Sequence, residues 1–187
     1  MEPSKGLTLF SFYRRWQFDG PLLGMLITML GVATVPSHSM DFSARELDQG
    51  NALEREINAQ RVRVGMPVLQ PLNQNLQKIQ LTYSDGVLDE LLESANCDHD
   101  YSAFQNLQNL ISKSPENIGT AIPESEVIGC PSQARNWSPR SMVERWEQSP
   151  HHYKILFERP NRSNIGCSVK FRGGLVASLC TLWAPNN

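Results

Sequence analysis

The chain has 187 residues, of which 19% are charged and 40% are apolar, and its formal net charge is −2. This composition is too apolar for an intrinsically disordered chain, and the length fits one domain plus an additional segment. The sequence contains no basic patch interleaved with aromatic residues, so we expect no nucleic-acid partner.

The first predicted element is the N-terminal segment 1–39. Three basic residues precede an uncharged stretch whose apolar core runs from Leu22 to Val35. This core has the length of a signal-peptide apolar region and falls short of the ~20 residues that span a membrane comfortably. The segment is therefore either a cleaved signal peptide, which we favour, or an uncleaved anchor. Both interpretations predict a secreted, periplasmic or cell-envelope protein, which would meet a membrane only through an uncleaved N-terminus.

After a polar linker over residues 40–52, the sequence predicts a helix from Leu53 to about Val64, which a glycine and a proline end. A second helical pattern starts at Leu72. It either ends at Ser84-Asp85-Gly86 or continues through Leu92. The stretch 93–136 is weakly periodic and rich in Ser, Asn, Pro and Gly, which predicts irregular structure with short elements.

A further helix is predicted to begin at Ser138, because a serine followed by proline is a typical helix start. Met142, Val143 and Trp146 would form its buried stripe, and Pro150 would end it. Helices, an irregular middle and a C-terminal strand pair indicate an α+β domain.

The C-terminus predicts a β-hairpin. Two segments with alternating side chains, 165–171 and 176–182, flank Gly173-Gly174. This glycine pair suits a two-residue turn, which requires positive φ angles.

All four cysteines, Cys97, Cys130, Cys167 and Cys180, lie outside the N-terminal segment, and their even number favours disulfides in an exported protein. Counting outwards from the turn places Cys167 opposite Cys180, at a non-hydrogen-bonded position where Cα atoms lie ~4.5 Å apart. Cys97 would then pair with Cys130. A bulge or a longer loop would shift this register and leave the pairing open.

Four short motifs occur in a fixed order. They are N-x-x-R-x-x-x-G-x-x-x-L from Asn58 to Leu69, Cys97-Asp98-His99-Asp100, Glu116-Asn117-Ile118, and W-x-x-S-P-x-H from Trp146 to His152. In this order the motifs resemble those of the CAP superfamily (cysteine-rich secretory proteins, antigen five and pathogenesis-related proteins), especially its bacterial SCP-like branch. The resemblance covers the domain predicted over residues 53–187 and implies a three-layer α-β-α sandwich of the CAP type with a C-terminal antiparallel hairpin.

The resemblance also implies a surface cleft that is often lined by two histidines and two acidic residues. His99, His152 and Glu116 match three of these positions, whereas Ser149 stands where a second glutamate is often found. Two imidazoles and a carboxylate would suit zinc or another divalent cation. Glu116 is equally compatible with a structural role, and His151 does not hold the motif position.

We therefore predict a monomeric binding or interaction module for an unknown envelope or extracellular ligand, rather than an enzyme. The alternative is a metal-assisted hydrolase of peptide or cell-envelope material, in which a metal-bound water is activated by Glu116. The unmatched second acidic position favours the binding module.

Overall fold

The computed structural model describes residues 42–94, 96–113 and 121–186. The predicted signal peptide or anchor over 1–39 lies outside the described residues, and so does Glu116. In the described part of the chain the helices are α1 (Ala44–Arg63), α2 (Gln74–Ser94), α3 (Tyr101–Lys113), α4 (Pro139–Gln148) and α5 (Pro150–Phe157), with a 3-10 turn at Ala134–Asn136. The strands are β1 (Gln70–Pro71), β2 (Ala121–Gln133), β3 (Asn164–Arg172) and β4 (Leu175–Pro185).

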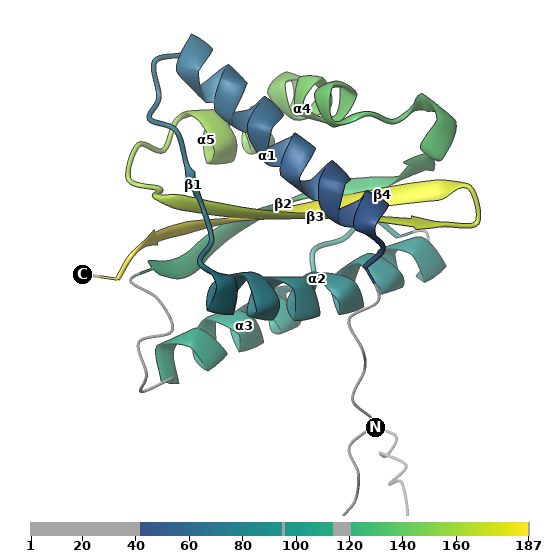
Figure 1. Cartoon of the computed structure of the whole chain (residues 1–187), viewed down its shortest axis with the longest axis horizontal. Coiled ribbons are helices and arrows are strands. Elements are labelled where there is room, and N and C mark those ends of the chain that lie inside the picture. The colour runs from purple at the N-terminus through teal and green to yellow at the C-terminus, as the bar shows by residue number, and fades with distance from the viewer. Residues whose placement is uncertain (1–41, 95, 114–120, 187) are drawn as a thin grey trace, which may run out of the picture. The chain divides into compact units, whose positions relative to one another are not determined.

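The strands form one mixed sheet in the order β1-β3-β4-β2. Strand β1 is parallel to β3, whereas β4 is antiparallel to both of its neighbours. Helices α1, α4 and α5 cover one face of the sheet, and α2 and α3 cover the other (Figure 1). This arrangement confirms the predicted α+β class and the three-layer α-β-α sandwich with a C-terminal antiparallel hairpin.

The hairpin has the predicted turn and register. Gly173 and Gly174 both have positive φ angles, 57° and 80°, as a two-residue turn of this hand requires. Cys167 faces Cys180 with a Cα–Cα distance of 4.1 Å, and the two are disulfide-bonded. The second disulfide joins the other two cysteines, whose Cα atoms are 5.2 Å apart. Both predicted pairings are confirmed.

Helix α1 begins earlier than predicted, so residues 44–52 of the predicted linker over 40–52 are helical. Its start is a capping box in which Ser43 N–H donates to Glu46 at 2.8 Å and Glu46 N–H donates to Ser43 Oγ at 3.3 Å. The first turns of α1 lack apolar periodicity because their polar side chains meet a sheet edge instead of the apolar core.

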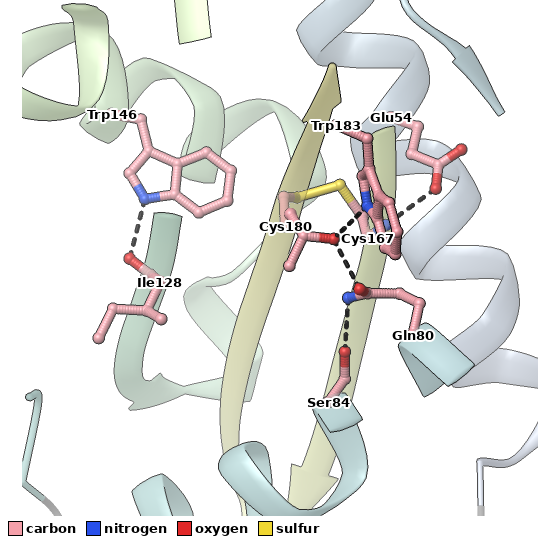
Figure 2. The surroundings of a disulfide bond; sticks show 9 residues. Glu54, Gln80, Ser84, Ile128, Trp146, Cys167, Cys180 and Trp183 are labelled. Atoms are coloured by element: carbon pink, nitrogen blue, oxygen red, sulfur yellow. Dashed lines mark hydrogen bonds between the residues drawn. A yellow bond between two sulfur atoms is a disulfide. The ribbon is translucent and has the colours of Figure 1, made fainter. Parts of the chain in front are cut away.

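That edge belongs to β3, which β1 pairs over only two residues. Glu54 accepts a hydrogen bond from the backbone N–H of Cys167 at 2.9 Å, and Glu46 accepts one from Phe171 at 2.8 Å. Figure 2 shows Glu54 aimed at Cys167 beside the hairpin disulfide. Two carboxylates of α1 therefore satisfy outward-facing donors of β3, which an uncovered edge strand would leave open to pairing with another chain.

A buried polar chain lies close to the hairpin disulfide, between the sheet and α2 (Figure 2). Trp183 Nε1–H donates to Thr181 Oγ1 at 2.8 Å, the Thr181 hydroxyl donates to Gln80 Oε1 at 2.6 Å, and the Gln80 amide donates to Ser84 Oγ at 2.8 Å. All four residues are buried. The polar positions of α2 that face the sheet are thus paired, which permits α2 to pack on it.

The prediction of irregular structure over 93–136 is wrong, because this stretch contains α3 and the 13-residue strand β2. The Asp100 carboxylate accepts from the N–H of Ala103 at 2.9 Å and so stabilises the start of α3. Strand β2 carries register shifts between Pro123 and Ser125 and again between Gly129 and Ser132. These irregularities interrupt the two-residue alternation by which a strand is predicted from sequence.

Helix α2 takes the longer of its two predicted forms and continues to Ser94. Ser138 caps α4 as predicted, with Pro139 at its first position. Pro150 follows the end of α4 but is also the first residue of α5, with Ser149 between the two helices. A proline fits that position because the first N–H of a helix has no partner within the helix. His152 therefore lies in the first turn of a helix.

The motif that opens the resemblance has a structural role. Asn58 Nδ2 donates to the carbonyl of Leu69 at 2.9 Å, and the N–H of Leu69 donates to Asn58 Oδ1 at 2.8 Å. Gly65, with a φ of 77°, reverses the chain between them. The asparagine and the leucine thus close the loop between α1 and β1.

Arg61 completes this loop. Its side chain is fully buried, and its Nε–H donates to the carbonyl of Pro67 at 2.8 Å. The two terminal nitrogens donate to the carbonyls of Leu156 and Arg159, the latter at 3.3 Å. Burial lowers the pKa of Arg61 from its usual range. One guanidinium therefore joins the loop after α1 to the C-terminal end of α5.

Candidate functional site

His99 lies in the loop between α2 and α3, two residues after a cysteine of the Cys97–Cys130 disulfide. Its Nδ1 is 2.7 Å from Oε1 of Glu126, a residue of β2. The histidine side chain is 20% exposed and the glutamate side chain 6%. The disulfide fixes the loop to β2, and the buried carboxylate fixes the ring within it.

Glu126 also binds a second side chain. The hydroxyl of Tyr83, on α2, donates to Oε2 of the same carboxylate. Burial, the Glu126 charge and this hydrogen bond raise the pKa of Tyr83, so the phenol keeps its proton and acts as a donor. Glu126 therefore bridges a phenol and an imidazole, which we call the Tyr83–Glu126–His99 chain.

This chain determines which nitrogen of His99 carries the proton. An ionised carboxylate is an acceptor only, so the Nδ1–H of His99 donates to Glu126 and Nε2 is left for another partner. The ring lines a hollow of about 300 Å³. We call it the polar hollow, because most of its lining side chains are polar, namely Glu90, Ser94, Asn96, Asp98, His99 and Asp100.

His152 lines a different hollow, of about 280 Å³, together with Cys130, Met142 and Trp146. Its ring centroid is 6.4 Å from that of Trp146. Burial lowers the pKa of His152, and the nearby charges of His151 and His99 lower it further, which favours the neutral ring.

Trp146, which lines this second hollow, is fixed to the sheet by a hydrogen bond. Its Nε1–H donates to the carbonyl of Ile128 in β2 at 3.0 Å (Figure 2). The side chain is 1% exposed, in agreement with its prediction as a core residue. Strand β2 therefore contributes to both histidine environments, through Glu126 on one side and through Ile128 and Cys130 on the other.

Among the residues that the structure describes, no three histidine, cysteine or acidic side chains lie close enough together to hold a metal ion. Glu116, the predicted carboxylate of the cleft, lies outside these residues. Zinc binding by His99 and His152 thus stays a prediction. His151, which was not assigned to the site, is exposed, with its ring centroid 5.8 Å from that of His152.

Glu126 is one of two site residues that were not predicted from the sequence, and Tyr83 is the other. Glu126 lies in β2, whose irregular register hides the strand pattern, and it belongs to none of the four motifs. One signal was present in the sequence, since Glu126 is an acidic residue directly before an apolar run that leads into Cys130. A charged residue at the start of a buried run requires a partner, but the sequence does not name that partner.

The sequence matches no protein-family model, and a search of curated proteins finds no relative. The fold does have a counterpart among solved structures. The chain is similar to an outer surface protein from Borrelia burgdorferi. The TM-score is 0.55 at 15% sequence identity, and the match covers 74% of this chain and 94% of the Borrelia chain.

The similarity to the Borrelia protein establishes the fold, which is CAP-like, but at this identity it carries no site residue from one protein to the other. The match is nearly complete on the Borrelia side, so the similar fold extends over almost the whole of that chain. Within the described part of this chain, no helix is long and apolar enough to cross a membrane.

Proposed function

We propose that this chain is an exported CAP-superfamily binding module of the cell envelope or the extracellular space, with its recognition site around the Tyr83–Glu126–His99 chain. The two disulfides support export, because such bonds persist in oxidising compartments. The fold shared with a protein named as an outer surface protein agrees with this location.

The observation that carries the proposal is the bridging carboxylate of Glu126. A buried carboxylate that accepts from both an imidazole and a phenol orients the two rings before any ligand arrives. Preorganisation of this kind lowers the entropy cost of binding. A ligand group in the polar hollow would meet His99 Nε2 in a defined direction.

A divalent cation such as zinc is a further part of the proposal, with the imidazoles of His99 and His152 as its ligands. The lowered pKa of His152 favours the neutral form that a metal requires. Glu126 would hold Nδ1 of His99 and leave Nε2 for the ion, as carboxylates commonly do for metal-binding histidines. Zinc affinity should then fall as both rings become protonated at lower pH.

The test of the binding function is co-sedimentation of the purified full chain with cell-envelope material from its source organism. We expect His99→Gln to reduce the retained fraction, with an apparent Kd about tenfold weaker, which corresponds to ~1.4 kcal/mol. His151→Gln is the matched control, because His151 is an exposed histidine outside the Tyr83–Glu126–His99 chain, and it should bind like the wild type. Equal retention of all three proteins would contradict the proposal.

The same incubation tests the hydrolase alternative. Release of soluble fragments from the envelope material, abolished by a chelator, would indicate metal-assisted hydrolysis instead of binding alone. Calorimetric titration with zinc would test the ion separately. His152→Gln should then weaken zinc binding and His151→Gln should not, whereas equal zinc affinity of both variants would exclude His152 as a ligand.

A further inference from the structure

The polar hollow continues into an apolar groove between α2 and α3. This α2/α3 groove has a volume of about 550 Å³, and its apolar side chains come from both helices, namely Ile79, Val87, Ala103, Leu107 and Leu110. Val87, Glu90 and Asp100 line the groove and the hollow alike, so the two spaces adjoin. Together they form one site with an apolar part and a polar part.

The apolar part is open to a ligand from outside. Leu110 is 56% exposed although it lines the groove. Tyr83 lines the same groove, while its hydroxyl is held by Glu126. A volume of this size lies within the range of pockets that hold small molecules. The groove therefore suits a short hydrocarbon chain.

The polar part carries negative charge and aromatic surface. Three carboxylates line the hollow, from Glu90, Asp98 and Asp100. Tyr101, which is 78% exposed, lies beside it with its ring centroid 5.8 Å from that of His99. Carboxylates attract cations at long range, and aromatic faces bind ammonium groups through cation–π contacts.

From this complementarity we propose that the α2/α3 groove and the polar hollow bind a single-chain amphiphile with an ammonium head group. The alkyl chain would lie along Leu107 and Leu110, and the head group would lie among Glu90, Asp98 and Tyr101. This inference deepens the proposed function, on which it rests, by naming the class of ligand that the site next to His99 accepts.

The test is isothermal titration of the full chain with decyltrimethylammonium below its micelle threshold. We expect saturable binding at one site. The octyl homologue should bind about 15-fold more weakly, since each buried methylene contributes ~0.8 kcal/mol. Decanoate, which has the same chain with an anionic head, should bind at least tenfold more weakly than decyltrimethylammonium.

Matched variants separate the two parts of the site. Leu110→Gln should weaken binding of every alkyl ligand. Val62→Gln should not, because Val62 is an exposed apolar residue of α1, which lies on the other face of the sheet (Figure 1). The double variant Glu90→Gln, Asp98→Asn should bind decyltrimethylammonium about tenfold more weakly than the wild type does. Its affinity for decanol, which has no charged head group, should be unchanged. Glu144→Gln with Glu158→Gln removes the same net charge elsewhere and should have no such effect.

Equal affinity for the cationic and anionic chains, or no saturable binding, would overturn the inference. The proposed function would survive that result if His99→Gln still reduced retention on envelope material. The opposite result is saturable binding of decyltrimethylammonium together with envelope retention that His99→Gln does not change. It would contradict the proposed function and leave the amphiphile site supported.

Discussion

Two regions of the molecule carry motifs of the same family resemblance but differ in what those residues do. Around Arg61 each of the three guanidinium nitrogens donates to a backbone carbonyl, and the side chain is fully buried. Around His99 the ring is partly exposed, its Nδ1 is held by Glu126, and the side chain lines a hollow that carboxylates also line. The first region is closed and the second is open.

The difference shows that motifs of one resemblance can lie in a closed, packed region or beside an open hollow. Under the proposed function, the open region is the one that serves recognition. Arg61 donates its hydrogen bonds to its own chain and joins two loops. The Tyr83–Glu126–His99 chain instead holds one imidazole in a fixed direction next to open space. Substitutions in the two regions should therefore affect different properties, stability in the first and binding in the second.

The largest effect is expected from Arg61→Ala. Three backbone carbonyls would lose their donor, at a cost of ~1–3 kcal/mol for each group left unsatisfied. We expect the free energy of unfolding in urea to fall by about 3–5 kcal/mol, against about 1 kcal/mol for His99→Gln. A loss below 1 kcal/mol for Arg61→Ala would show that this region is not the structural one.

Removal of the disulfides should have the next largest effect. The Cys97–Cys130 bond spans 33 positions and the Cys167–Cys180 bond 13. In the chain-entropy model the longer loop contributes about 4 kcal/mol and the shorter about 3 kcal/mol. Paired Cys→Ser variants, unfolded in urea under identical conditions, should rank in this order. Only loss of the longer bond should also weaken binding, because it holds the loop of His99.

Glu54 should make stability depend on pH. Burial raises the pKa of Glu54 from 4.5 to about 7, against smaller lowering effects of the Cys167 hydrogen bond and the Arg55 charge. Because the folded-state pKa lies above the unfolded one, the stabilising contribution is complete below pH 4.5 and is lost as pH rises through about 7. Allowing for partial solvent exposure, we expect a loss of about 2 kcal/mol across this interval.

Glu54→Gln tests this dependence, because its amide oxygen can still accept from Cys167 but does not ionise. Its unfolding free energy should change less than that of the wild type between pH 4.5 and 7. Glu56→Gln, on the same helix, should keep the wild-type slope. The same slope in Glu54→Gln as in the wild type would assign the dependence to other groups.

The smallest effect is expected from Tyr83→Phe, which removes one donor from Glu126 and leaves the ring in place. We expect a loss of about 1 kcal/mol in unfolding free energy. Tyr153→Phe is the control, because Tyr153 packs against Phe157, with ring centroids 5.3 Å apart, and it should change stability by less. An unchanged stability in Tyr83→Phe would mean that the hydroxyl does not support the carboxylate.

The sequence predicted the parts of the molecule that depend on neighbours along the chain. The hairpin follows from strict alternation around Gly173-Gly174, and that register determined both disulfides. Polar residues with distant partners could not be predicted in the same way. Glu46 lies in the first turn of α1, and its partner Phe171 lies 125 positions later, so the stretch around Glu46 resembled a linker.

The site shows the same division. His99 and His152 were identified because short motifs surround them. Glu126 was not, because its role depends on contacts with Tyr83 and His99, which lie 43 and 27 positions away. The sequence around a carboxylate in an irregular strand does not indicate which side chains the carboxylate will contact in the folded chain.

The central claim is that Glu126 orients His99 for recognition. Long-range ¹H–¹⁵N NMR of the imidazole nitrogens in the full chain tests it most directly, at a pH where the ring is neutral. We expect His99 to be protonated at Nδ1 in the wild type and to lose this preference in Glu126→Gln. A wild-type ring protonated at Nε2, with the same spectrum in Glu126→Gln, would contradict it.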